Sequence, residues 1–371
     1  MRAVDIIIRK RDGGALTRDE IAFAVAGVTA GSLPDYQASA LLMAILLRGM
    51  SKEETAWLTD AMVRSGVRVD LSLAEMKAAL KKTGCAMIGQ TAEIAPADKK
   101  LYALRDVTGT VESIPLISAS IMSKKIAEGI DALVLDVKTG SGAFMKTEQD
   151  SRRLAESLVS IGNASGVRTE AVITSMNAPL GRAVGNALEV IECLEVLKGR
   201  GPKDVIDVSV ELTARMLVLG RIASDRPSAE RRARAAIASG EGLERFRRII
   251  EGQGGDPRVC DEYERLPATG LRHVVTATRA GYLARLDAEL VGRASVALGA
   301  GRDRVQDAVD PAVGVMVLAK PGDELRAGEP ILELHYRDRA RLETAEGLAA
   351  RAVVVGDARP SVEHLIVGEV P

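Results

Sequence analysis

The sequence predicts a multidomain α/β protein with three parts: a small all-helical domain, an α/β domain with a mixed sheet, and a C-terminal module that is β-rich with α+β character. Three observations support this class. Helix-start patterns and apolar helices fill the beginning, strand-like and helix-like segments alternate in the middle, and short alternating segments between Gly and Pro turns fill the end. We expect a helical domain from residues 1–65 with 97–128, an α/β domain from 66–96 with 129–255, and a C-terminal module over 268–371.

The N-terminal part is predicted to be packed helices. Residues 37–50, QASALLMAILLRGM, are apolar nearly all round, as in a buried helix. Three pairs have the spacing of a capping box, in which a hydroxyl and a carboxylate satisfy free N–H groups at a helix start: Thr17 with Glu20, Ser51 with Glu54, and Ser72 with Glu75.

The middle of the chain changes to alternating strands and helices. Residues 85–90 are expected to form a short buried strand, and 131–137, DALVLDV, form an apolar run typical of a parallel sheet. Between these strands a loop leads into a helix, and a second helix follows. For this second helix, Ser113 is a plausible N-cap, Pro115 lies in the first turn, and Gly129 can end the helix. A further helix over 151–166 and a strand over 168–176 complete a βαβ unit. Four more helices are expected near 186–199, 205–219, 228–239 and 241–251, followed by a linker over 256–267.

Composition excludes several function classes. The net charge is −1 with acids and bases mixed along the chain, so there is no basic surface for nucleic acid and no polybasic patch for a membrane. The apolar run near the start is too short for a signal peptide, and no later run reaches the ~18 residues of a membrane span. We therefore expect a cytoplasmic protein. Cys85, Cys193 and Cys260 are too widely spaced for a disulfide framework or a zinc site, and are expected to be buried thiols.

One polar stripe in the middle helices suggests chemistry. On a helix that advances 100° per residue, Ser120 and Lys124 lie on one face together with Ser113. With Arg105 from the preceding segment, they could hold a planar ligand that has two carbonyl oxygens and a ring nitrogen, and the two cations could stabilise a leaving anion. A solvated helix face is the alternative. The glycine-rich stretch 138–145, KTGSGAFM, could present N–H groups to a ligand or form only a tight turn, and Asp98 could be only a helix cap.

Long motifs in the right order resemble the pyrimidine-nucleoside phosphorylase family, which includes thymidine phosphorylase. They are IIRKRDGGALTRDEI near the start, IGQTAEIAPADKKLYALRDVTGTVESIPLISASIMSKKIAEGIDALVLDVKTGSGAFM in the middle, and APLGRAVGNALEVIECLEVLKG after it. The resemblance extends over nearly the whole chain. It implies reversible phosphorolysis of uridine or thymidine, a pentosyl transfer that gives the free base and a (deoxy)ribose 1-phosphate.

The resemblance also implies site residues and partners. Arg105 and Lys124 would contact the base carbonyl oxygens and serve as catalytic residues, Ser120 would contact the ring nitrogen, and Tyr102 would form a wall of the base pocket. No organic cofactor is expected, phosphate is the co-substrate, and the family is a homodimer. A monovalent cation such as K⁺ would, by this resemblance, be held by the main-chain carbonyls of Leu180 and Ala183 and by the Glu192 carboxylate.

The sequence departs from the family at one place. The family has a Lys-His-Ser-Thr-Gly-Gly phosphate loop and a later Gly-His-Thr-Gly-Gly stretch, and neither occurs here. The missing piece would amount to two βα units, on the order of 60 residues, near 66–72. A phosphorolytic enzyme that cannot position phosphate loses ~7–11 kcal/mol of barrier lowering, so little or no phosphorolysis is expected. The missing strand would also leave a gap or an open edge in the sheet.

Three rival interpretations remain open. The chain could be a non-catalytic or truncated paralogue that binds pyrimidines or only dimerises. It could be a phosphoribosyltransferase of related fold, such as the anthranilate enzyme, although the YALRDVTGTVESIPL match argues against this. The turn in residues 317–334, VLAKPGDELRAGEPILEL, resembles biotinyl and lipoyl domains, but no carrier lysine motif accompanies it.

Overall fold

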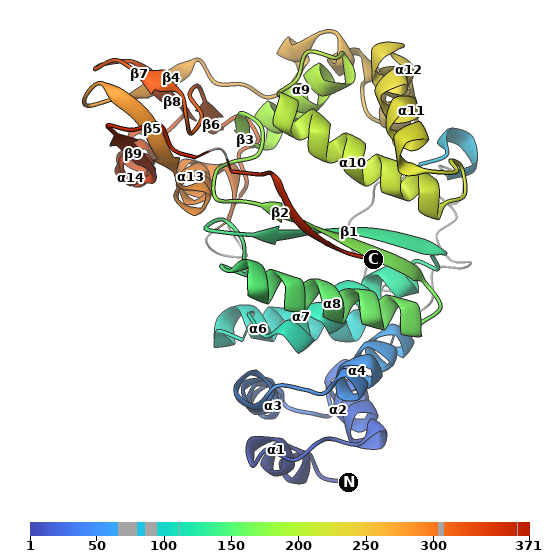
Figure 1. Cartoon of the computed structure of the whole chain (residues 1–371). Helices are drawn as coiled ribbons and strands as arrows, with labels where there is room; N and C mark the ends of the chain where they lie inside the picture. Colours follow the sequence, from blue (N-terminus) through green and yellow to red (C-terminus); the bar gives the residue numbers. More distant parts are fainter. Residues whose placement is uncertain (66–79, 86–94, 111, 303–307, 362) are drawn as a thin grey trace.

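The computed structural model describes residues 1–65, 80–85, 95–110, 112–302, 308–361 and 363–371. Within these ranges the three predicted parts are present: N-terminal helices, a mixed sheet flanked by helices, and a strand-rich C-terminal part (Figure 1). The predicted strand 85–90, the capping box of Ser72 with Glu75 and the position of the missing family segment lie largely outside the described residues. No helix within the described ranges has both the length and the apolar character that crossing a membrane requires.

The N-terminal helices are α1 (Ala3–Arg11), α2 (Arg18–Ala30), α3 (Asp35–Arg48) and α4 (Lys52–Arg64). Two predicted capping boxes are confirmed, because Thr17 with Glu20 and Ser51 with Glu54 make both reciprocal side-chain-to-backbone bonds. The apolar faces of these helices share one core with α6 (Pro96–Thr108) and α7 (Ile114–Ala127).

Helix α7 packs against two separate hydrophobic cores, and its polar residues lie where the two cores meet. Its Leu116 and Ala119 belong to the core of the N-terminal helices, whereas Ile117 and Met122 pack with α8 (Glu148–Ala164) and the sheet. Pro115 and the left-handed Gly129 are found as predicted, but the side chain of Ser113 makes no capping bond. Polar residues of α7 that face α6 or the sheet therefore lie at a seam between two packed layers.

The central sheet has the order β1-β2-β10. Strands β1 (Ala132–Thr139) and β2 (Arg168–Ser175) are parallel and joined by α8, which confirms the predicted βαβ unit. Strand β10 (Ile366–Val370) pairs antiparallel with β2, so the sheet is mixed. Helices α6, α7 and α8 lie on one side of this sheet and α10 on the other (Figure 1). Among the described strands, β1 pairs only with β2 and forms an edge.

Four helices and two short turns follow the sheet. The helices are α9 (Asn186–Leu197), α10 (Lys203–Leu219), α11 (Arg226–Ala238) and α12 (Glu241–Gly252), close to the predicted ranges. The predicted linker contains the 3₁₀ turns Pro257–Cys260 and Tyr263–Arg265. The expectation of buried cysteines is confirmed for Cys260 but wrong for Cys193, which is exposed, while Cys85 is only partly buried.

The C-terminal part has two small sheets around its own core. One has the order β3-β6-β8-β4, from β3 (Ala183–Gly185), β6 (Gly314–Val317), β8 (Pro330–Tyr336) and β4 (Leu271–Thr276). The other has the order β7-β5-β9, from β7 (Glu324–Leu325), β5 (Gly281–Leu286) and β9 (Val353–Gly356). Helices α13 (Ala288–Ser295) and α14 (Arg339–Ala352) pack between them. Strand pairing crosses the predicted domain boundaries, because β3 joins the C-terminal sheet and β10 joins the central one.

Candidate functional site

A cavity of about 520 Å³ lies between α6, α7, β1 and the middle of α8. This volume is within the range of pockets that hold small organic ligands. Its walls are largely apolar, with a few polar groups from α6, α7 and β1. The lining residues include all four predicted base-binding residues: Tyr102, Arg105, Ser120 and Lys124.

Helical spacing explains why these side chains meet. Asp98, Tyr102 and Arg105 are at positions i, i+4 and i+7 of α6, within ~60° of one another around the helix. Ser120 and Lys124 are one turn apart on α7. Because α6 and α7 pack against each other, the two polar faces close on one cavity. The solvated-face alternative is therefore wrong, since Arg105 is only 2% exposed and Ser120 is buried.

Arg105 is a buried lining residue of this cavity, and several contacts hold it in place. Its Nη1 donates to the Leu116 carbonyl at 3.0 Å, its Nε donates to the Thr110 carbonyl at 3.4 Å, and its guanidinium lies 5.7 Å from the centre of the Tyr102 ring. Burial lowers the pKa of Arg105, and the negative charge of Asp98 partly offsets this effect. Arg105 remains a cation at neutral pH because an arginine pKa starts so high.

Lys124 is held by two partners. Its Nζ donates to Asp98 Oδ2 at 2.5 Å and to Ser120 Oγ at 3.1 Å. The interpretation of Asp98 as a helix cap is wrong: α6 begins after Ala95, and the Asp98 side chain pairs with Lys124 on α7. The helical spacing of Asp98 relative to Arg105 was the signal that could have identified it from sequence.

The glycine-rich stretch is a tight turn between β1 and α8. Four successive N–H groups, those of Gly140, Ser141, Gly142 and Ala143, donate to Met145 O, Asn177 Oδ1, Met176 O and Gly140 O, respectively. These N–H groups are therefore not directed at a ligand. The turn instead brings Phe144 and Met145 to the cavity, with Phe144 62% exposed near its mouth.

A charged group on β1 also borders this cavity and was not predicted. Lys138 Nζ donates to Asp136 Oδ2 at 2.7 Å and to Thr174 Oγ1 at 2.9 Å, while Thr174 donates to Asp136 Oδ1 at 2.5 Å. Each member has a partner from β1 or β2, so the group ties the two strands together beside the cavity. No sequence spacing shows the pairing to Thr174, because it comes from the neighbouring strand.

Two of the three predicted cation residues, Ala183 and Glu192, meet at the start of β3. Glu192 Oε1 accepts from the N–H of Arg182 at 2.6 Å and of Ala183 at 3.1 Å. Burial raises the pKa of Glu192 despite these hydrogen bonds. Ala183 thus meets Glu192 through its N–H, and a cation would have to share the carboxylate with these two amides. Among the described residues, no group of three or more His, Cys, Asp or Glu side chains could hold a metal ion.

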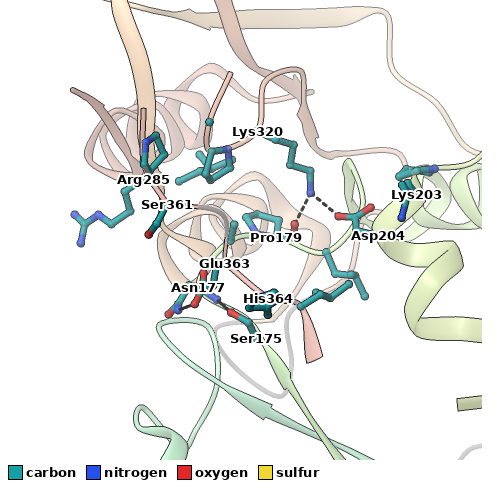
Figure 2. A pocket seen from close by; sticks show the side chains of 18 of the residues that line it. Ser175, Asn177, Pro179, Lys203, Asp204, Arg285, Lys320, Ser361, Glu363 and His364 are labelled. Atoms are coloured by element: carbon teal, nitrogen blue, oxygen red, sulfur yellow. Dashed lines mark hydrogen bonds and ion pairs between the residues drawn. The ribbon is translucent and has the colours of Figure 1, made fainter. Parts of the chain in front are cut away.

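Leu180 lines a second cavity, of about 630 Å³, between the end of β2, the start of α10 and the C-terminal part. Figure 2 shows Lys320 pointing across it toward the carbonyl of Pro179 and the carboxylate of Asp204, at 2.6 and 3.0 Å. Asn177, which fixes the glycine-rich turn, lies at the other side beside Glu363. Three charged residues of α10 line this cavity, and each has a partner: Lys203 pairs with Asp207, and Asp204 pairs with Lys320.

Comparison with known proteins assigns the family. Three family descriptions match: "Glycosyl transferase family, helical bundle domain" over residues 4–66, "Glycosyl transferase family, a/b domain" over 49–243, and "Pyrimidine nucleoside phosphorylase C-terminal domain" over 282–356. The solved structure of anthranilate phosphoribosyltransferase from Thermus thermophilus superposes with a TM-score of 0.50 at 16% identity, covering 67% of this chain and 99% of that one. This likeness concerns the fold alone.

Curated relatives are much more similar in sequence. The pyrimidine-nucleoside phosphorylase of Bacillus subtilis is 44% identical over 90% of this chain and 92% of its own length. That of Staphylococcus aureus is 42% identical over 434 aligned positions, which include all of both chains. Since this chain has 371 residues, 63 of those positions (434 minus 371) have no counterpart in it. The chain therefore belongs to the pyrimidine-nucleoside phosphorylase family, a family of pentosyltransferases.

Proposed function

We propose that the cavity between α6 and α7 binds the pyrimidine base of a nucleoside, and that the reaction is reversible phosphorolysis of uridine or thymidine. The observation that carries this proposal is that Tyr102, Arg105, Ser120 and Lys124 line one cavity. The relatives named above, at 42–44% identity, are pyrimidine-nucleoside phosphorylases, which supports the substrate class. The products would be the free base and a (deoxy)ribose 1-phosphate.

The cavity supplies what the departing base requires. A uracil or thymine ring leaves the sugar as an anion, with its charge spread over the two carbonyl oxygens and the ring nitrogen. Arg105 and Lys124 are two cations held in place before the ligand arrives, and such preorganised charges stabilise a developing anion better than mobile water does. The apolar walls, among them Ile117 and Ile121, would pack against the ring faces.

The lack of a family phosphate loop in the sequence favours a second candidate function. The family's phosphate loop has no counterpart in the sequence, and the four N–H groups of the glycine-rich turn are already used within the protein. This combination favours a protein that binds pyrimidines but releases no base. Both candidates share the base cavity and differ only in whether phosphate can be positioned for attack.

Two further parts of the proposal concern a cation and a second copy of the chain. A monovalent cation such as K⁺ would use Glu192 together with main-chain oxygens of Leu180 and Ala183, and Glu192 already lies against this loop. A homodimer would cover apolar side chains that α1 and α3 expose: Val4, Ile8, Tyr36, Met43 and Leu47, which are 37–73% exposed.

The test is phosphate-dependent release of uracil from uridine and of thymine from thymidine. Lys124→Ala is compared with Lys125→Ala, because Lys125 is the next residue on α7, pairs with Glu128 and does not line the cavity. Release that Lys124→Ala abolishes and Lys125→Ala retains would support the enzyme. No release, with uracil binding that only Lys124→Ala loses, would support the pyrimidine-binding protein. Absence of both release and binding in the wild-type protein would refute the proposal.

A further inference from the structure

The cavity beside Lys320 has no part in the base binding proposed above. Its volume of about 630 Å³ exceeds that of the base cavity and is enough for a drug-sized molecule. The end of β2, the start of α10 and three segments of the C-terminal part, around Leu286, Lys320 and Pro360, form its walls. None of the four base-binding residues lines it, and of the predicted cation residues only Leu180 does. It is therefore a separate site.

The described residues that line this cavity include more bases than acids. Five of them are basic and three are acidic, a formal excess of two positive charges with histidine neutral: Arg182, Lys203, Arg285, Lys320 and Arg359 against Asp204, Asp207 and Glu363. The whole chain has a net charge of −1, so this excess is a local property of the cavity. Such a lining favours an anionic ligand.

Two arginines of this lining have no carboxylate partner. Lys203 and Lys320 each pair with an aspartate of α10, and Arg285 lies 3.9 Å from the carboxylate at the N-cap of α13. In the part of the chain that the structure describes, no carboxylate lies within ion-pair distance of Arg182 or Arg359. A guanidinium group presents a planar set of donors that fits a phosphate or carboxylate. These two side chains can therefore bind an incoming anion without first leaving another one.

Both arginines lie beside the segment between β6 and β7. Arg182 Nη1 donates to the carbonyls of Val317 and Leu318, at 3.1 and 2.7 Å, which holds the side chain while its Nε and Nη2 bond to no described residue. A Cβ at Gly322 would lie 3.9 Å from Arg359 Nε, so Arg359 flanks the end of the same segment. The ammonium group of Lys320 extends across the cavity from between them (Figure 2). The positive charge is thus concentrated on one side of the cavity.

Much of the remaining lining is apolar. Four prolines and two leucines contribute to it: Pro179, Pro202, Pro321, Pro360, Leu286 and Leu365. Proline rings are rigid, so they present fixed apolar surfaces to a ligand. A molecule that fills this cavity needs an apolar body in addition to its anionic group.

We propose that this cavity binds an organic phosphate, a phosphate monoester attached to an apolar ring. A phosphate monoester has a charge of about −1.5 to −2 at pH 7 and three acceptor oxygens. It therefore matches an excess of two positive charges better than a carboxylate does, and it has enough acceptors for both Arg182 and Arg359. The inference does not depend on base binding, because the two cavities share no lining residue.

The first experiment measures four probes by calorimetry at constant ionic strength: phenyl phosphate, benzoate, benzamide and inorganic phosphate. Phenyl phosphate should bind about 10-fold more tightly than benzoate, because it carries the second negative charge, and more tightly than inorganic phosphate, because it has the ring. Benzamide, which is neutral, should bind most weakly. Inorganic phosphate that binds as tightly as phenyl phosphate would overturn the requirement for an apolar ring. Benzamide that binds as tightly would overturn the requirement for an anion.

A matched pair of variants tests the location of the site. Arg359→Gln should weaken phenyl phosphate by about 10-fold. Arg326→Gln should not, because Arg326 is an equally exposed arginine of the C-terminal part that does not line the cavity. The double variant Arg182→Gln with Arg359→Gln should lose the preference for phenyl phosphate over benzamide. Because Arg359 is exposed and has no described partner, its replacement does not threaten the fold.

Lys124→Ala separates this cavity from the base cavity, where phenyl phosphate could also meet cations. The inference expects Lys124→Ala to bind phenyl phosphate as the wild-type protein does. Binding that Lys124→Ala loses and Arg359→Gln retains would place the ligand in the base cavity and overturn the inference. Equal binding by Arg359→Gln, Arg326→Gln and the wild-type protein, or no binding of phenyl phosphate at all, would overturn it too. Each of these outcomes leaves the test of uracil binding unaffected.

Discussion

The buried ion pair between Lys10 and Glu54 gives the sharpest prediction about stability. Both side chains are almost fully buried, at 4% and 3% exposed, and Lys10 Nζ donates to Glu54 Oε1 at 2.8 Å. Lys10→Met should leave Glu54 buried without its cation. Breaking a buried pair in this way costs ~3–5 kcal/mol, and we expect the lower end because the N–H groups of Leu16 and Ser51 still bond to the carboxylate.

The sequence provides a local probe for this measurement. Its single tryptophan, Trp57, lies on α4 and packs on the core of the N-terminal helices, one turn from Glu54. Urea unfolding followed by tryptophan fluorescence should show the midpoint reduced by ~1–3 M, for a slope of ~1–3 kcal/mol/M. Arg18→Gln is the matched control, because the pair of Arg18 with Asp60 is exposed and contributes ~0.2–1 kcal/mol.

The loss should also depend on pH. Burial tends to raise the pKa of Glu54, but hydrogen bonds from Leu16, Lys10 and Ser51 outweigh it, so the pKa in the folded protein lies below the ordinary value of 4.5. Glu54 therefore stabilises the fold above pH ~4.5, and this contribution is lost as the pH falls through its folded pKa. Removing Lys10 removes part of the downward shift, so Lys10→Met should cost most near neutral pH and less in acid. A midpoint for Lys10→Met no lower than that of Arg18→Gln would refute the reasoning.

Three other predictions follow from single contacts. A Cβ at Gly140 would lie 2.3 Å from Asn177 Oδ1, so Gly140→Ala should weaken uracil binding by displacing the turn, whereas Gly166→Ala, at a similar positive φ but in open space, should leave binding unchanged. Arg215→Met should leave Glu369 on β10 without its main cation, and hydrogen exchange should then be faster in β10 than in β1. Glu192→Gln should abolish any rise in melting temperature produced by K⁺ relative to Na⁺, and an equal rise in the variant would exclude Glu192 as a ligand.

Local patterns in the sequence predicted much of this fold correctly. The capping boxes of α2 and α4, the parallel strands β1 and β2, and the polar faces of α6 and α7 follow from spacing within one element or one βαβ unit. Such features depend on residues that are near in sequence, where helix and strand periods determine which side chains share a face. The base cavity was therefore predictable as soon as α6 and α7 were expected to pack together.

Features that join distant segments were not predicted. Nothing in the IVGEV of residues 366–370 indicates pairing with β2, about 190 positions earlier, and three residues at 183–185 are too few to indicate a strand of the C-terminal sheet. Two of the hydrogen bonds that fix the glycine-rich turn are accepted by Asn177, on the loop after β2.

The layout of the cavity between α6 and α7 leads to a prediction about phosphate dependence. The described residues that line it lie between positions 98 and 158, on α6, α7, β1, the following turn and α8. We expect uracil to bind with the same affinity in phosphate buffer and in a phosphate-free buffer of equal ionic strength, as measured by calorimetry. Markedly tighter binding in phosphate would contradict this expectation, because it would require an anion site in contact with the base among residues that this layout assigns to the base alone.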